Sequence, residues 1–266
     1  MILIVGRNGF LAKSVARRPD AANFRFISHE QIDDVDVFDG VTSLVNLAVD
    51  PRYMTQSYQE TFDFELRVGK AIATSDIHYV LLSSRKVYSP EVLMSVTEDA
   101  ATGGVDDYGR NKRTTEKALE EILGRRLTIF RLANVAGFDD QWDRPTFMAR
   151  MLSGLRSEGR VSLDLSPFAR RDFITDDAVA EAVIRAAKIQ PGGYFNLGSG
   201  IALGIGQLAI WIIDGFGRGE LLSTRPEIRD EFCLNVVKLE TQFGKLCTVD
   251  DIRNKCFDAG RGLRFV

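Results

Sequence analysis

Short apolar runs alternate with segments of helical apolar spacing along most of this chain. Residues 2–5 form an apolar run that ends in glycine, and apolar side chains then recur at helical spacing over residues 10–17. This order predicts a strand, a tight turn and a helix. By the same two patterns we expect strands at residues 24–28, 43–48, 79–83, 127–132, 161–165 and 194–197. We expect helices over residues 58–74, 108–123, 145–157 and 176–188.

The alternation of strands and helices predicts an α/β fold built on a doubly wound parallel, Rossmann-like sheet. Residues 79–83 are apolar on both faces of the expected strand, which is typical of a parallel sheet covered by helices on each side. Beyond about residue 200 the pattern becomes mixed. We therefore expect a smaller, mixed C-terminal lobe packed on the carboxyl ends of the strands.

One strand of the usual set is expected to be missing or vestigial. Only 14 residues, 29–42, separate the second expected strand from the third. A complete nucleotide-binding half would insert a helix, a strand and a helix there, and this segment is too short to hold them. The strand at residues 24–28 should therefore lie at or near an edge of the sheet.

Composition excludes several classes of function. The 266 residues include 34 Lys and Arg against 37 Asp and Glu, so the net charge of -3 provides no field that would attract nucleic acid or an anionic membrane. The three cysteines and two histidines lack metal-ligand spacing, and we assign the chain to a reducing cytoplasm with no metal site. The longest apolar stretch, residues 201–213, falls short of the roughly 20 residues that span a bilayer.

The first strand-to-helix turn carries a glycine pattern. It reads Gly6-Arg7-Asn8-Gly9-Phe10-Leu11-Ala12. A dinucleotide pyrophosphate would lie here against the helix amino terminus, because Gly6 and Gly9 permit close backbone approach. The alternative is a turn that uses glycine only for its positive φ.

Two further segments carry candidate chemistry. Tyr108 and Lys112 lie four residues apart on an expected helix, so the phenol and the ammonium share one face. A phenol has a reference pKa of about 10, and a nearby Lys cation favours its ionised form. Ser83 and Ser84 stand at the carboxyl end of an expected strand, where open α/β sheets place their ligands. The alternatives are a chance Tyr–Lys pair and a serine that caps a turn.

Together these segments resemble the extended short-chain dehydrogenase/reductase family, the NAD-dependent epimerase/dehydratase group that acts on nucleotide sugars. The likeness covers most of the chain. It extends to the segments Arg131-Leu132-Ala133-Asn134-Val135-Ala136-Gly137, Arg171-Asp172-Phe173-Ile174 and Asn196-Leu197-Gly198-Ser199-Gly200.

The resemblance implies a role for each matching residue. Tyr108 would be the catalytic acid/base, Lys112 its activator and a ligand of the nicotinamide ribose, and Ser84 a hydrogen-bond partner of the reacting oxygen. Asn134 and Arg171 match positions that hold the substrate's diphosphate, although Arg171 paired with a carboxylate is the alternative. Besides Tyr108 and Lys112, the residues implied in cofactor binding are Gly6, Arg7, Asn8, Gly9, Phe10, Leu11, Ser28, Leu47 and Ala48.

Two departures from the family pattern change the expected chemistry. After the second strand, where members that prefer NAD place an acid, this chain has Ser28 and His29. We favour NADP, with Arg7 pairing its 2′-phosphate, while Glu30 remains an alternative source of the missing acid. Where sugar-nucleotide dehydratases have an acidic pair, this chain has Arg85-Lys86, which argues against dehydration.

The leading hypothesis is an NAD(P)-dependent oxidoreductase that reduces the keto group of a nucleotide-activated (deoxy)sugar, with Tyr108 as proton donor. The first alternative is an NAD-dependent nucleotide-sugar epimerase. The second is a non-catalytic NAD(P)-binding sensor, and the presence of both Tyr108 and Lys112 argues against it. The resemblance implies an NAD(P)-binding domain in residues 1–137, joined by 171–198, and a substrate lobe in 138–170 and 199–266. It also suggests a homodimer through the helices at 58–74 and 108–123.

Overall fold

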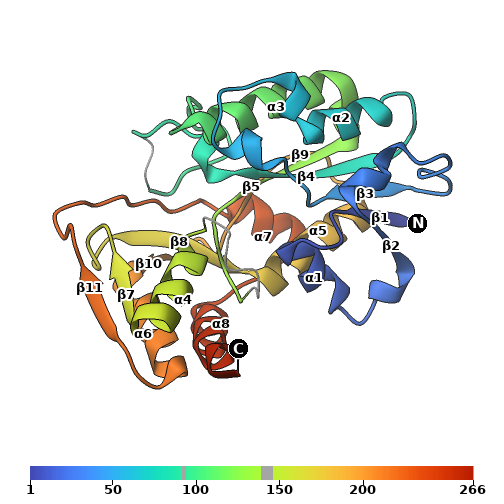
Figure 1. The fold of residues 1–266 in the computed structure, drawn as a ribbon. Coiled ribbons are helices and arrows are strands. Elements are labelled where there is room, and N and C mark those ends of the chain that lie inside the picture. Colours follow the sequence, from blue (N-terminus) through green and yellow to red (C-terminus); the bar gives the residue numbers. More distant parts are fainter. Residues whose placement is uncertain (92–93, 139–145, 266) are drawn as a thin grey trace.

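A parallel sheet of six strands forms the centre of the protein. The computed structural model describes residues 1–91, 94–138 and 146–265. The strand order is β2-β1-β3-β4-β5-β9, and each neighbouring pair is parallel (Figure 1). The strands are β1 (Ile2–Val5), β2 (Phe24–Ile27), β3 (Ser43–Asn46), β4 (His78–Ser84), β5 (Leu127–Leu132) and β9 (Gly193–Leu197). The expected doubly wound α/β fold is confirmed.

Strand β2 lies at the edge of this sheet. Residues 29–42, all of which the structure describes, form the short 3-10 helix η2 (His29–Asp33) and turns, with no strand among them. Ser28 caps η2 immediately after β2 ends, and its N–H donates to Gln31 Oε1 at 3.0 Å. The prediction that one strand of the usual set is missing is therefore confirmed.

Helices cover both faces of the sheet. α2 (Phe64–Ala71) and α3 (Asp107–Leu123) lie over one face, and α1 (Phe10–Ala16) and α5 (Asp176–Ile189) over the other (Figure 1). α2 is shorter than the expected helix at 58–74, because Asp63 caps the helix and residues 58–63 lie before its start. The Asp63 Oδ1 accepts the Leu66 N–H at 2.9 Å, and its Oδ2 accepts the Tyr58 hydroxyl at 3.0 Å. This cap starts the helix at Phe64.

The remaining strands form two small sheets. β8 (Arg170–Thr175) lies between β6 (Asn134–Ala136) and β10 (Ala202–Gly204), while β7 (Arg160–Leu163) pairs with β11 (Glu220–Ser223). The strand predicted at 161–165 is thus β7, whereas β8 was not predicted, because it opens with charged residues. The helices α4 (Phe147–Glu158), α6 (Ile205–Phe216) and α8 (Val249–Gly262) accompany these sheets, whereas α7 (Val237–Phe243) packs on β9 of the main sheet. Among the residues that the structure describes, no helix combines the length and apolarity needed to cross a membrane.

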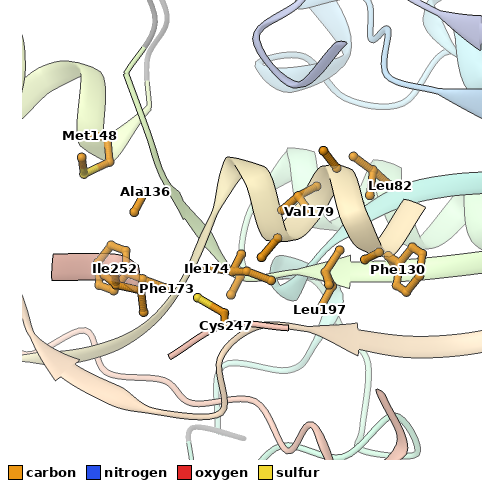
Figure 2. Packing of buried hydrophobic residues seen from close by; sticks show 14 of the residues in the cluster. Leu82, Phe130, Ala136, Met148, Phe173, Ile174, Val179, Leu197, Cys247 and Ile252 are labelled. Atoms are coloured by element: carbon orange, nitrogen blue, oxygen red, sulfur yellow. The ribbon is translucent and has the colours of Figure 1, made fainter. Parts of the chain in front are cut away.

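One large apolar cluster joins the small sheets to the main sheet. Figure 2 shows Phe173 and Ile174 of β8 near Val179 of α5, with Phe130 of β5 farther along the same cluster. All four side chains are fully buried. Burial of this area fixes β8, and with it the residues that precede α5, relative to the carboxyl ends of the main strands.

Candidate active site

The first turn of α3 packs directly on the segment that follows β4. The Asp106 side chain caps α3 by accepting the Gly109 N–H at 2.9 Å, and it also accepts a bond from Lys86 Nζ at 2.6 Å. Gly109 lies so close to the Lys86 carbonyl that a Cβ at this position would overlap it. The 3-10 helix η5 (Arg85–Val87) and the start of α3 are therefore held together, which brings Ser84 near Tyr108.

Lys112 ties α3 to the carboxyl end of β4. Its Nζ donates to the Leu82 carbonyl at 2.9 Å and to the Glu65 carboxylate, and it lies 5.6 Å from the centroid of the Tyr108 ring. Ser84 Oγ accepts the Lys86 N–H at 3.2 Å, so this serine also caps η5. The structure thus gathers the three candidate catalytic residues at one end of β4.

Glu65 of α2 is a member of this group that the sequence analysis missed. The Glu65 side chain is 3% exposed and the Lys112 side chain 2%. Glu65 Oε2 has no hydrogen-bond partner among the described residues. Burial raises the pKa of Glu65 to about 7, although Lys112 opposes this shift. A signal was present in the sequence, since Val68, Gly69 and Ile72 follow Glu65 at helical spacing on one apolar face.

The electrostatics around Tyr108 differ from the expectation. Lys112 was expected to favour the ionised phenol, and it does lower the pKa of Tyr108. Burial acts in the opposite direction and is the largest cause, and Glu65 and Asp106 add to it, so the pKa of Tyr108 lies above its ordinary value. A raised pKa favours the protonated phenol, which suits a proton donor.

The 3-10 helix η3 (Pro51–Met54), of which Tyr53 is buried, packs on α3. The Tyr53 hydroxyl is 2.6 Å from Thr115 Oγ1, and Asn111 Nδ2 donates to the Tyr53 carbonyl at 2.8 Å. The Tyr53 ring meets the Tyr108 ring edge-on, with 6.3 Å between centroids. Tyr53 is 2% exposed, so it excludes water from this side of Tyr108.

The glycine turn brings the backbone of residues 6–9 close to the segment after β3 and leaves the start of α1 uncapped. Gly6 has φ +95, and a Cβ there would lie 3.0 Å from the Ala48 nitrogen and 3.1 Å from the Leu47 carbonyl carbon. Gly9 stands at the N-cap of α1 with no side-chain cap, and the first turn of α1 holds no acid. The helix N–H groups are thus left for an anion, and Leu47 and Ala48 lie beside the turn as expected.

The end of β2 lies next to the same turn. The Arg7 N–H donates to the Ile27 carbonyl at 3.0 Å, while the Arg7 and Asn8 side chains are exposed. Ser28 is buried, and both its N–H and its hydroxyl are directed to Gln31 Oε1. Arg7 therefore adjoins the end of β2 with its side chain exposed, whereas the Ser28 hydroxyl already has a partner.

The two candidate substrate residues lie in different surroundings. Asn134 begins β6, and its Nδ2 is buried without a hydrogen-bond partner among the described residues. Arg171 of β8 donates from Nη2 to Asp230 Oδ2 at 2.5 Å and from Nε to the Asp230 carbonyl at 2.9 Å. The carboxylate partner considered for Arg171 is therefore present, although Asp230 itself is 49% exposed.

Comparison with known proteins agrees with these features. A sequence model of the NAD dependent epimerase/dehydratase family matches residues 2–198. The chain belongs to this family. Its members are NAD-dependent enzymes, and the chain is an enzyme of this class rather than a non-catalytic sensor. No curated protein matches it significantly.

Solved structures show the same fold over the full length of this family member. A UDP-N-acetylglucosamine 4-epimerase from Methanobrevibacter ruminantium M1 is 17% identical with a TM-score of 0.80, and the alignment covers 98% of this chain and 96% of that chain. A UDP-N-acetylglucosamine 4-epimerase from Bacillus cereus is 20% identical with a TM-score of 0.77, covering 99% of both chains. The NDP-hexosamine 5,6-dehydratase TunA is 17% identical with a TM-score of 0.78, covering 99% of this chain and 97% of that one.

Proposed function

We propose that this enzyme is an NAD(P)-dependent oxidoreductase that reduces the keto group of a nucleotide-activated (deoxy)sugar. The observation that carries the proposal is the cluster of Ser84, Tyr108 and Lys112 at the carboxyl end of β4, with Tyr108 kept protonated by its surroundings. A keto oxygen at this point would accept hydrogen bonds from Ser84 and Tyr108, and the phenol would then transfer its proton to that oxygen.

The chain would hold its cofactor between the glycine turn and Lys112. When bound, the nicotinamide supplies the hydride. Gly6 and Gly9 would let the pyrophosphate approach the start of α1, and Lys112 would turn from Glu65 toward the nicotinamide ribose. The proposed cofactor region consists of residues 1–137 with 171–198. The proposed substrate lobe consists of residues 138–170 with 199–266.

NADP is the favoured cofactor in this proposal. The support is the exposed Arg7 side chain beside the end of β2, since a guanidinium can pair with a 2′-phosphate. The exposed Glu30 is the competing group, because its carboxylate would instead bind ribose hydroxyls. Titration with NADPH and NADH decides between them, and a ten-fold preference for NADH would contradict the assignment.

An NAD-dependent nucleotide-sugar epimerase is the second candidate. The similarity to two 4-epimerases over 98–99% of this chain favours it, and the same three side chains would serve the reaction. Incubation with NADPH and a nucleotide-linked 4-keto-6-deoxyhexose separates the candidates. A reductase consumes one NADPH for each alcohol formed, whereas an epimerase interconverts two sugar alcohols with no net consumption.

The expected homodimer remains a prediction. Among the described residues, none of the large exposed apolar side chains lies on α2 or α3. The exposed side chains of these helices include Arg67, Lys70 and Lys117. A dimer formed through them would have polar contacts, and light scattering that gives about the mass of one 29.7 kDa chain would refute it. The cytoplasmic assignment also remains a proposal.

A further inference from the structure

A cavity next to the candidate catalytic group holds an incompletely paired cation. It has a volume of about 70 Å³, opens to solvent, and is lined by residues that include Arg85, Tyr88, Ser89, Val105, Asp230 and Phe232. The cavity adjoins the catalytic group, since Arg85 follows Ser84 in the chain and the Val105 N–H donates to the Lys86 carbonyl at 3.0 Å.

The Arg85 guanidinium is fixed in place but makes no hydrogen bond among the described residues. Its carbon atom lies 3.8 Å from the centroid of the Phe232 ring, so the aromatic face holds it flat. The side chain is only 15% exposed. Burial lowers the pKa of Arg85 to about 10, although Asp230 and Asp106 oppose this shift.

Its one nearby carboxylate is shared. Arg85 Nη2 is 3.8 Å from Asp230 Oδ2, whereas the same oxygen is 2.5 Å from Arg171 Nη2. Two guanidinium groups therefore face a single carboxylate, and the closer contact belongs to Arg171. The cavity lining thus holds one cation and one carboxylate, and the Arg85 guanidinium presents N–H donors without a hydrogen-bond partner among the described residues.

We propose that Arg85 binds a carboxylate carried by the sugar ring of the substrate, so that the substrate class is a nucleotide-activated acidic sugar. This inference rests on the proposed function, which places the sugar beside Ser84 and Tyr108. Because the diphosphate is proposed to bind at Asn134 and Arg171, we assign the acceptor at Arg85 to the sugar end of the substrate. A carboxylate matches the planar fork of a guanidinium and would supply the missing hydrogen bonds.

The test compares binding of UDP-glucuronate and UDP-glucose, which differ in the carboxylate, by calorimetry in the presence of NADP. Wild type should bind UDP-glucuronate at least ten-fold more tightly than UDP-glucose, since charge-assisted bonds of this kind correspond to about ten- to hundred-fold in affinity. Arg85→Gln should abolish this preference and leave the Kd for UDP-glucose within about two-fold of wild type. Arg85→Lys, which keeps the charge without the fork, should retain only part of it.

The control is Arg253→Gln, which removes an exposed cation on α8 and should leave both affinities unchanged. Equal binding of the two sugars by wild type overturns the inference and leaves the proposed function intact. Equal weakening of both sugars by Arg85→Gln also overturns it, because Arg85 would then serve the nucleotide or the fold. Failure of wild type to bind either UDP-sugar contradicts the inference and the proposed function together.

Discussion

Replacing Glu65 with glutamine should change how the stability of the protein depends on pH. In the folded chain the pKa of this buried carboxyl is raised from 4.5 to about 7, chiefly by burial. The folded protein therefore keeps a proton that the unfolded chain has lost, so wild type loses unfolding free energy as the pH rises through this window. The Glu65→Gln variant has nearly the same shape but cannot ionise, and this loss should be absent from it.

The size of the effect follows from the two pKa values. A rise of the pKa from 4.5 to about 7 corresponds to about 3 kcal/mol in total, of which about three quarters falls between pH 5 and pH 8. Relative to the variant, wild type should lose that amount over this interval. The comparison concerns how the unfolding free energy changes with pH. Any part of the mutational effect that is the same at both pH values, such as a constant loss from the altered Lys112 contact, therefore cancels.

Chemical denaturation of both proteins at the two pH values measures this change. Glu60→Gln is a matched control, since Glu60 is a 65% exposed carboxylate just before the same helix. The reasoning would be refuted if the difference in unfolding free energy between wild type and variant stayed constant, or if wild type became relatively more stable as the pH rises. Either result would mean that Lys112 keeps Glu65 ionised throughout. As a second readout, removing the Glu65 charge should lower the pKa of Tyr108 and move the basic limb of the reduction rate to lower pH.

Three further substitutions test other parts of the site. Gly6→Ala places a Cβ 3.0 Å from the Ala48 nitrogen at φ +95, so NADPH affinity should fall at least ten-fold and stability by about 1–3 kcal/mol, measured by titration and denaturation. Arg171→Lys should raise KM about ten-fold with cofactor binding unchanged; a lower Tm with normal KM would instead make its Asp230 contact purely structural. Asp172→Asn should lower stability by about 2 kcal/mol or more, because the buried carboxyl accepts bonds from Ser199, and an unchanged denaturation midpoint would contradict this.

The main sheet could be predicted from the sequence because each of its strands is a short apolar run next to a helix of clear spacing. The prediction of an edge position for β2 needed only the length of residues 29–42. β8 was missed because its first three residues are charged, and their burial depends on distant partners. Asp172, for example, is fully buried since Ser199 and Leu234 donate to it.

The candidate site was predicted in part for the same reason. Tyr108 and Lys112 are neighbours on one helix, so their spacing places them on one face. The Glu65–Lys112 and Arg171–Asp230 pairs join residues that lie 47 and 59 positions apart, and no local pattern records such contacts. These long-range partners contribute to the raised pKa of Tyr108 and place Asp230 between Arg171 and Arg85.

The most direct test of the central claim is the rate of NADPH oxidation by wild type and Tyr108→Phe with a nucleotide-linked 4-keto sugar. Wild type should consume one NADPH for each sugar alcohol formed. Tyr108→Phe should bind NADPH with nearly the same Kd but lose turnover, because the missing phenol is the proton donor and contributes little to cofactor binding. A variant that keeps more than about a tenth of the wild-type rate, a loss below about 1.4 kcal/mol, would contradict the account.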